Sequence, residues 1–373
     1  MDAPASQLAW LRLLCTPGLG PAAGERLLAR WPTPQAIVDA SAASWQSAGV
    51  DRALHAACRA VSDAEIENCL NWLAQPGCAL IPRDDPRYPP RLRDQPRAPL
   101  ALFTKGDPDL LTRPQLAIVG ARSATPQGLE NARAFAAELT RYGLVVSSGL
   151  ALGVDAAAHE GALDAGGLTL AVCGTGLDRV YPARHRELAH RICEDGLLVS
   201  EFVPGTVAKA EHFPRRNRII SALSLGVLVV EAAKQSGSLI TARLAAEQGR
   251  ELFAIPGSIH NPMARGCHQL IREGAKLVET AADILEELAP QLSGWVPAAP
   301  SAEPAKGDMA APSAEVQALV AALDDAATSV EDLCRRLDWP AQKVNTVLLE
   351  AELAGFADRL QDGRYMRGVG AGA

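Results

Sequence analysis

The stretch from Ala117 to Gly128 reads Ala-Ile-Val-Gly-Ala-Arg-Ser-Ala-Thr-Pro-Gln-Gly. A strand-like apolar run ends there, a glycine follows, and a helix start comes next. Glycine lets the backbone approach a ligand, and the first amides of a helix present free N–H groups to an anion. The stretch therefore predicts a strand, a turn suited to phosphate and a helix, although a generic strand-to-helix turn has the same pattern.

Strands and helices alternate on both sides of this stretch. Short runs rich in Val, Ile and Leu predict buried strands at residues 115–119, 144–147, 168–173, 197–201, 226–231, 251–255 and 276–279. Stretches of helical period lie between them, at residues 128–142, 155–165, 238–249 and 264–273. The alternation predicts an α/β core with a parallel sheet covered by helices on both faces. Such sheets bind ligands at the carboxyl ends of their strands, where Gly120, Gly149 and Gly174 stand.

Two smaller regions flank this core. The amino-terminal residues are helical in pattern, with breaks at 17–20 and 31–34, and the first break has the form of a helix-hairpin-helix turn. Five prolines among residues 290–313 indicate a linker, and three helical stretches with a hairpin around Asp362 and Gly363 predict a winged helix beyond it. We expect a SAM-like, helix-hairpin-helix domain at 1–80, the core at 81–289, the linker at 290–313 and the winged helix at 314–373.

The composition bears on the location of the protein and on its ligand, and for the ligand the net charge alone is misleading. Its 373 residues include no apolar run near the length of a membrane span and no signal peptide at Met1, so we expect a cytoplasmic protein with no membrane partner. Eight scattered cysteines without a Cys-x-x-Cys pair predict reduced packing residues. The formal net charge of -7 argues against nucleic acid. However, residues 203–250 sum to +4 and residues 278–338 to -9, so a cationic face on the core is compatible with an acidic protein.

The densest chemical cluster runs from His212 to Ser221. It holds Arg215, Arg216 and Arg218 with Asn217 at a helix start, beside the aromatic Phe213. Cations and a stacking platform are the combination that single-stranded nucleic acid requires. A solvated, charged helix start is the alternative interpretation.

Three other strand ends hold weaker signals. Asp155 and His159 share a helix face, which suits an internal hydrogen bond better than a metal or acid–base pair. A glycine turn at Gly174 is followed by Arg179 and an aromatic residue. Glu231 precedes Lys234 and a hydroxyl-rich turn, and we expect it to pair with an arginine of the preceding helix rather than to act in catalysis.

Several catalytic signatures are missing from the sequence. The dinucleotide G-x-G-x-x-G spacing fails, and no P-loop, G-x-S-x-G or H-E-x-x-H occurs. We therefore expect no catalytic residues, no cofactor and no metal, and an enzyme is the minority hypothesis. The winged-helix region predicts protein contact rather than DNA reading, because its third helix carries Glu350 and Glu352 beside Lys343.

Taken in order, these motifs resemble the DNA processing protein A (DprA, or Smf) family. The resemblance covers Ile118–Arg122, Ser148–Asp155 with His159, Gly174–Asp178 with Tyr181-Pro182, Ser200-Glu201, Phe213–Ile220, Glu231 with Ser236–Ala242, and Pro256-Gly257 with Gly266-Cys267. It implies a Rossmann-like core that forms homodimers, binds and protects single-stranded DNA, and loads the RecA recombinase during natural transformation and homologous recombination. Two departures are Ala121, where the family usually has Ser, and His268, where it has Asn.

The resemblance also implies which residues bind DNA. It points to a pocket made of Gly120, Arg122, Ser148, Gly149, Gly174, Arg179, Lys209, Phe213, Arg215, Asn217, Arg218, Lys234, Ser236, Gly237 and Ser238. Among them, we predict that Arg122 and Arg218 bind phosphate and that Phe213 stacks on a base.

Two other functions stay open at this point. One is a Rossmann-like nucleoside-monophosphate phosphoribohydrolase that uses Glu231 and Arg218, although its Pro-Gly-Gly-x-Gly-Thr signature is missing. The other is an adaptor in which the core is an inactive nucleotide fold. A measurement of oligonucleotide binding distinguishes these two functions from single-stranded DNA binding.

Overall fold

A computed structural model of the chain describes residues 4–293, 313–323, 328–353, 356–359 and 364–367. The chain divides into two compact units, residues 1–300 and 301–373, which are described separately. Most of the expected linker, and the turn residues Asp362 and Gly363, lie outside the described residues.

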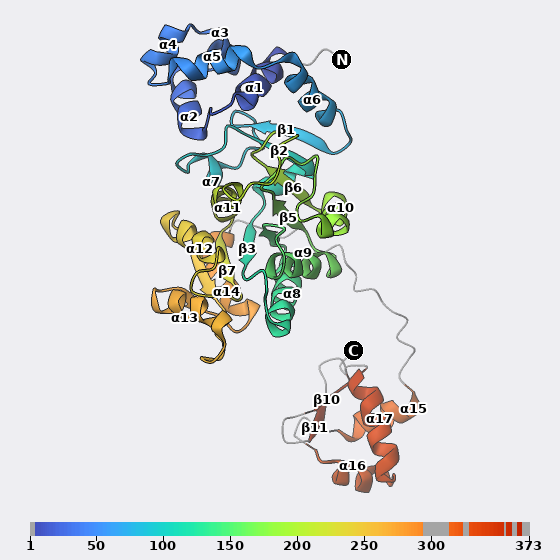
Figure 1. The fold of residues 1–373 in the computed structure, drawn as a ribbon. Helices are drawn as coiled ribbons and strands as arrows, with labels where there is room; N and C mark the ends of the chain where they lie inside the picture. Colours follow the sequence, from blue (N-terminus) through green and yellow to red (C-terminus); the bar gives the residue numbers. More distant parts are fainter. Residues whose placement is uncertain (1–3, 294–312, 324–327, 354–355, 360–363, 368–373) are drawn as a thin grey trace. The chain divides into compact units, whose positions relative to one another are not determined.

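Within the described residues, nine strands of the first unit form one sheet in the order β1-β2-β6-β5-β4-β3-β7-β8-β9 (Figure 1). The strands are β1 Cys78–Pro82, β2 Ala101–Gly106, β3 Gln115–Val119, β4 Val145–Ser148, β5 Thr169–Val172, β6 Leu197–Ser200, β7 Gly226–Val229, β8 Glu251–Ala254 and β9 Lys276–Leu277. The seven strands from β3 to β9 are parallel and confirm the expected α/β core.

One edge of the sheet has two strands that the sequence analysis did not predict. Strand β2 runs antiparallel to β6, and β1 runs antiparallel to β2. These strands lie outside the strand–helix alternation, because a short helix, α7 (Pro90–Arg93), and a proline-rich loop connect them. Since β1 begins at Cys78, the sheet starts within the region that the sequence favoured as helical.

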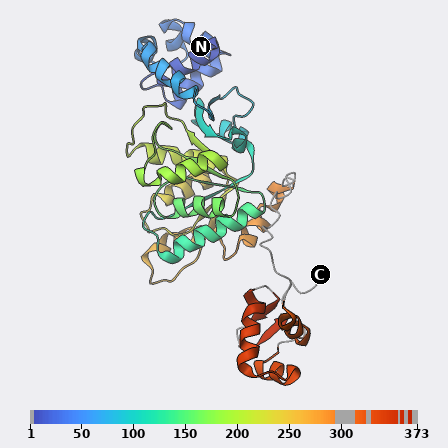
Figure 2. The same cartoon turned by 90° about the vertical axis from the view of Figure 1, so that its right-hand side faces the viewer.

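Helices cover both faces of the sheet (Figures 1 and 2). On one face, α8 (Pro126–Arg141), α9 (Val154–Asp164) and α14 (Ala281–Leu292) contribute to one apolar cluster with Leu116 and Ile118 of β3. On the other face, α11 (His212–Leu223), α12 (Ser238–Glu247) and α13 (Arg265–Arg272) contribute to a second apolar cluster with Ala117 and Val119. The alternation of side chains along β3 therefore divides its residues between two apolar layers, as a central parallel strand requires.

The amino-terminal helices form a bundle that rests on the antiparallel edge. The bundle consists of α1 Ala5–Cys15, α2 Pro21–Arg30, α3 Pro34–Asp39, α4 Ala42–Ser47, α5 Arg52–Ala60 and α6 Asp63–Leu73. Trp72 of α6 lies edge-on to Phe103 of β2, with 5.9 Å between ring centroids. Gly24 of α2 lies so close to Leu100 that a Cβ there would be 2.4 Å from a leucine methyl carbon. Small and aromatic residues thus join the bundle to the sheet.

The second unit is the expected winged helix. It contains α15 Ala314–Ala322, α16 Val330–Leu337, α17 Ala341–Leu353 and the antiparallel strands β10 Ala357–Arg359 and β11 Tyr365–Arg367. Its core includes Leu319, Leu333 and Val344, all fully buried. Lys343 is engaged within the unit, because its Nζ lies 2.8 Å from a Glu315 carboxylate oxygen and 4.5 Å from the centre of the Trp339 ring.

A buried histidine joins α9 to the sheet. The Nδ1 atom of His159 lies 2.6 Å from the Thr169 hydroxyl, which itself donates to the Val146 carbonyl at 2.7 Å. Because that hydroxyl proton is already used, Nδ1 must be the donor. His159 Nε2 is buried without a hydrogen-bond partner among the described residues. Burial lowers the pKa of His159 to about 3, so the ring is neutral in the folded protein.

This histidine should make folding sensitive to acid. An unfolded histidine binds a proton below its usual pKa of about 6.5, whereas the folded His159 does not. Its contribution to the free energy of unfolding is therefore intact above about pH 6.5 and falls as the pH drops toward 3, by about 2 kcal/mol at pH 5. We expect the free energy of unfolding, measured with urea, to fall between pH 7 and pH 5. This fall should be smaller by about 2 kcal/mol in His159→Gln than in the unmodified chain. If the free energy of unfolding fell equally in both proteins, His159 would not be the group that stays neutral in the folded state.

Candidate functional site

The sheet has one point where the order of its strands reverses. Strand β3 lies between β4 and β7: the chain proceeds from β3 through β4 and β5 to β6, then crosses back to β7 on the other side. The turns that follow β3 and β7 therefore diverge, and ligands of open α/β sheets bind in the crevice between such turns. A cavity of about 730 Å³ lies there. We call it the switch-point cavity; its walls come mainly from residues 119–123, 208–210, 213–214, 216–217, 235–238 and 240–241.

The turn after β3 forms one wall and is held by Glu231. The Glu231 carboxylate accepts hydrogen bonds from the Thr125 amide at 2.8 Å and the Thr125 hydroxyl at 2.7 Å, and its backbone carbonyl accepts from the Ala121 amide at 2.7 Å. Gly120 is required here, because a Cβ would lie 2.6 Å from Val154. The expected pairing of Glu231 with an arginine was wrong: among the described residues, its side chain fixes the start of α8 instead.

The turn after β4 contributes Ala151 to the cavity wall. Ser148 donates to the Ile118 carbonyl at 2.6 Å, and the Gly149 and Ala151 amides donate to Asp155 Oδ2 at 3.1 and 3.3 Å. The internal hydrogen bonds expected for Asp155 are confirmed. Because Ser148 and Gly149 are fully engaged inside the protein, they shape the turn rather than face the cavity.

Arg216 ties these turns together from α11. Its side chain is buried, and Nη1 donates to the Gly149 carbonyl at 2.6 Å and to the Val172 carbonyl at the end of β5. Burial raises the pKa of Asp155 and lowers that of Arg216, while the charge of each opposes the other's shift. Arg216 belongs to the basic cluster predicted from the sequence but not to the predicted site residues. The missed signal is helical spacing, because Arg216 shares a face with Ile219, Ile220 and Leu223, all buried.

An aromatic side chain and a cation form the mouth of the cavity. The Arg122 guanidinium carbon lies 5.7 Å from the centre of the Phe213 ring, and the Tyr181 ring lies 5.4 Å from the same ring. Gly174 packs behind Phe213, since a Cβ there would lie 3.0 Å from the ring. Arg122 and Lys209 are exposed and line the cavity. Phe213 thus has a supported face and cationic neighbours.

The opposite wall is a hydroxyl-rich helix start. The Ser236 and Ser238 hydroxyls lie 2.7 Å apart, and α12 begins at Ser238 with neither a side-chain cap nor an acidic residue in its first turn. The first amides of this helix are already used, because Ser238 donates to the Ser236 hydroxyl at 3.3 Å, and Leu239 and Ile240 donate to the Ser236 and Gly237 carbonyls. The hydroxyls are therefore the polar groups that this wall offers to a ligand. Lys234 is exposed beside this wall but does not line the cavity.

Three of the expected arginines are paired with carboxylates instead. Arg215 and Arg218 both donate to Glu201 Oε2, at 2.8 and 2.6 Å, and Arg179 pairs with Asp178 at 2.9 Å. The Arg218 side chain is only 15% exposed, and burial lowers its pKa. The structure therefore gathers a subset of the expected residues around the cavity, namely Gly120, Arg122, Lys209, Phe213, Asn217, Ser236, Gly237 and Ser238.

Two other properties bear on the chemistry of the site. Across the described parts of the chain, no group of three or more His, Cys, Asp or Glu side chains is arranged to hold a metal ion. No helix in those parts is long and apolar enough to cross a membrane.

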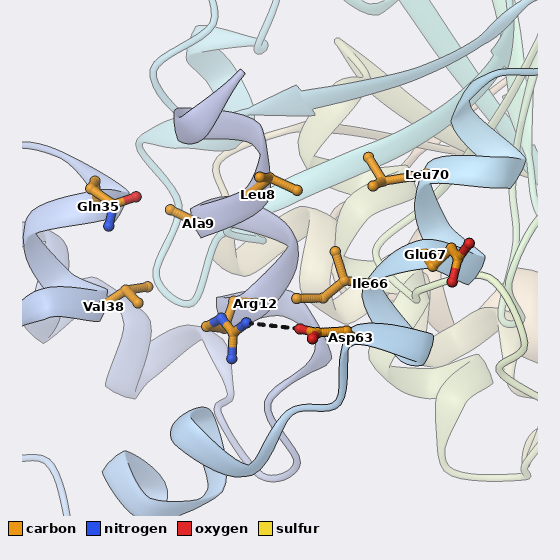
Figure 3. Close-up of a pocket in the computed structure, with 9 residues that line it drawn as sticks. All are labelled: Leu8, Ala9, Arg12, Gln35, Val38, Asp63, Ile66, Glu67 and Leu70. Atoms are coloured by element: carbon orange, nitrogen blue, oxygen red, sulfur yellow. Dashed lines mark ion pairs between the residues drawn. The ribbon is translucent and has the colours of Figure 1, made fainter. Parts of the chain in front are cut away.

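The amino-terminal bundle has a separate cavity of about 390 Å³ between α1, α3 and α6 (Figure 3). Arg12 and Asp63 form an ion pair at 3.6 Å on one side, and Leu8, Ile66 and Leu70 point toward its interior. None of the expected site residues lies there.

Known proteins match both units of the chain. A family model described as DNA recombination-mediator protein A matches residues 79–289, and a model of the DprA winged helix domain matches residues 297–363. Protein Smf of Escherichia coli (strain K12) is 43% identical over 366 residues, which span 96% of this chain and 95% of the relative. DNA processing protein DprA of Streptococcus pneumoniae is 49% identical over 203 residues, 54% of this chain and 72% of the relative.

Solved structures give the same result. The X-ray structure of DNA processing protein A from Streptococcus pneumoniae has 37% identity and a TM-score of 0.69, and covers 77% of this chain and 99% of that one. A structure of DNA processing protein A from Helicobacter pylori, which concerns that protein's single-stranded DNA binding mode, has 31% identity, a TM-score of 0.51, and coverage of 54% and 93%. The first family model spans more than half of the chain, and the Escherichia coli relative matches nearly all of it. The chain therefore belongs to the DNA recombination-mediator protein A family, known as DprA or Smf.

Proposed function

We propose that this protein binds single-stranded DNA in the switch-point cavity. The observation that supports this most directly is the Phe213 ring at the cavity mouth with the Arg122 guanidinium 5.7 Å from its centre. An aromatic face accepts an unstacked base of any sequence, and the neighbouring cation attracts the phosphate backbone. The Helicobacter pylori relative, whose structure concerns single-stranded DNA binding, supports the same ligand class.

Different walls of the cavity bind different parts of the strand. Phe213 stacks on a base, while Arg122 and Lys209, which also line the cavity, contact phosphates. At the start of α12, the Ser236 and Ser238 hydroxyls bind another phosphate oxygen. A duplex is disfavoured because its bases are already stacked and paired, and opening them costs free energy.

Arg218 has a different role in this proposal. Its guanidinium is buried against Glu201, so it positions the start of α11 rather than meeting a phosphate. Arg215, Arg179 and Lys234 are exposed and remain available to attract a strand that extends beyond the cavity.

The wider activity follows the family resemblance. We propose that the protein is a cytoplasmic homodimer that protects incoming DNA and loads RecA during transformation and recombination, and that it acts without catalysis. The phosphoribohydrolase alternative is not favoured, because Glu231 is bound to Thr125 and Arg218 to Glu201, so the two groups serve separate internal contacts. The winged helix has an exposed Glu350, and its Lys343 is engaged with Glu315, which suits a protein partner better than DNA.

Removal of the stacking platform should weaken binding. We expect Phe213→Ala to lose about 1–3 kcal/mol of binding free energy, or roughly fivefold to a hundredfold in Kd, because the base loses its aromatic partner. Fluorescence anisotropy with a labelled single-stranded oligonucleotide measures this loss. Tyr142→Ala is the matched control, since Tyr142 is 50% exposed and outside the cavity. Equal affinities of Phe213→Ala and the unmodified chain would refute the pocket.

Substitution of Arg122 and of Arg218 should have different effects on the salt dependence of oligonucleotide binding. We expect Arg122→Gln to lower the slope of log K against log salt by about 0.7–1, because one phosphate contact is lost. Arg218→Gln should keep the slope but lower the unfolding temperature, because it removes a donor from a buried carboxylate. A reduced slope in Arg218→Gln with an unchanged unfolding temperature would reverse these roles.

A further inference from the structure

Two cysteines of the amino-terminal bundle lie in contact. Cys15 is the last residue of α1, and Cys69 lies within α6, 54 residues later in the chain. Their sulfur atoms are 3.8 Å apart and share a hydrogen bond, and both residues carry free thiols. A disulfide holds its sulfurs about 2.0 Å apart, so bond formation requires the two atoms to approach by about 1.8 Å. The first and the last helix of the bundle thus place two thiols where a small movement joins them.

The two thiols differ in their access to solvent. Cys69 is 1% exposed and belongs to the apolar cluster that includes Leu11 and Trp72. Cys15 is half-buried and lines a surface cavity of about 410 Å³ beside the hairpin turn at residues 16–20. A reagent from solution therefore reaches Cys15 first, and Cys69 reacts only with a group that Cys15 already carries.

The hydrogen bond between the sulfurs also gives the two cysteines different chemical roles. With Cys69 as the donor, it stabilises a negative charge on the Cys15 sulfur and lowers the pKa of Cys15. The same hydrogen bond, together with burial, raises the pKa of Cys69. Because the thiolate is the form of cysteine that attacks a disulfide, Cys15 is the nucleophile of the pair.

We propose that Cys15 and Cys69 form a reversible disulfide by exchange with a low-molecular-weight disulfide such as oxidised glutathione. The Cys15 thiolate attacks one sulfur of the reagent, which gives a mixed disulfide and releases one glutathione thiolate. The Cys69 sulfur then attacks the Cys15 sulfur and displaces the second glutathione. The two released thiolates take up the protons that the two cysteines lose. Two protein thiols are thus oxidised while one glutathione disulfide is reduced to two glutathione thiols.

The bond constrains the whole bundle. It closes the chain between Cys15 and Cys69, a segment that contains the four helices α2 to α5. A cross-link over such a segment removes conformational freedom from the unfolded chain and stabilises the folded one. Disulfides of reducing compartments are usually transient and redox-sensing, so the pair makes the stability of the bundle depend on the thiol–disulfide balance. Neither cysteine lines the switch-point cavity, so this inference goes beyond the proposed DNA binding.

Peptide mapping of the unmodified full chain tests the bond directly. The folded protein is equilibrated with glutathione buffers of rising disulfide-to-thiol ratio, the exchange is stopped with acid, and the remaining thiols are blocked with N-ethylmaleimide in urea. After digestion with trypsin, we expect peptides 13–26 and 60–83, which contain Cys15 and Cys69, to be linked. The linked fraction should rise with the ratio and disappear after dithiothreitol. Cys78 shares the second peptide, so Cys78→Ala is the matched control, in which the link should persist.

Two further variants test the order of attack. In Cys69→Ala, Cys15 should retain a bound glutathione, because no second thiol displaces it. In Cys15→Ala, Cys69 should remain free in the folded protein, because it is buried. Oxidation should raise the unfolding temperature of the unmodified chain by about 5 °C or more, and that of Cys15→Ala by less than about 1 °C.

A link between Cys15 and Cys69 in the folded, unmodified chain supports the inference. The inference is overturned if no linked peptide forms at any ratio, if Cys15 is joined to Cys78 instead, or if the link appears only in protein oxidised in urea. None of these measurements involves DNA, so failure of this inference and failure of the switch-point cavity are distinguishable.

Discussion

The buried guanidinium of Arg216 is the contact on which the ligand edge of the sheet depends. It reaches from α11 to the carbonyls of Gly149, after β4, and Val172, at the end of β5. Asp155 completes the cluster by accepting the amides of Gly149 and Ala151. A buried charge is tolerated only when it is paired and hydrogen-bonded. The two turns, α9 and α11 must therefore be in place together, and the floor of the switch-point cavity is set before any ligand arrives.

Two buried carboxylates extend this arrangement along the same edge. Glu231 holds the turn after β3 and the start of α8, while Glu201 gathers Arg215 and Arg218 at the start of α11. Part of the basic block is thus neutralised inside the protein. Arg122, which lies against the face of an aromatic ring, and Lys209 are exposed cations that line the cavity. Local accessibility of charge, rather than its total, decides where an anionic chain binds.

Sequence reasoning succeeded where a signal is local. The parallel strands lie within two residues of their expected bounds, because apolar periodicity and turn residues act over a few positions. It missed β1 and β2, since β1 is only half-buried and β2 lacks a following long helix. It also gave Glu231 the wrong partner, because the nearest donor to a strand end comes from a different turn, at Thr125.

The sequence alone determined the alternation of strands and helices, the glycine turns at strand ends and the family to which these motifs belong. Only the tertiary structure decided that the turns after β3 and β7 share one cavity, because that depends on the strand order. It also decided which arginines of one cluster face the sheet, a carboxylate or the solvent. Arg216, Arg218 and Arg215 differ in burial although they are near neighbours in the chain. The physical reason is that pairing and desolvation depend on distances between residues far apart in the sequence, which local patterns do not contain.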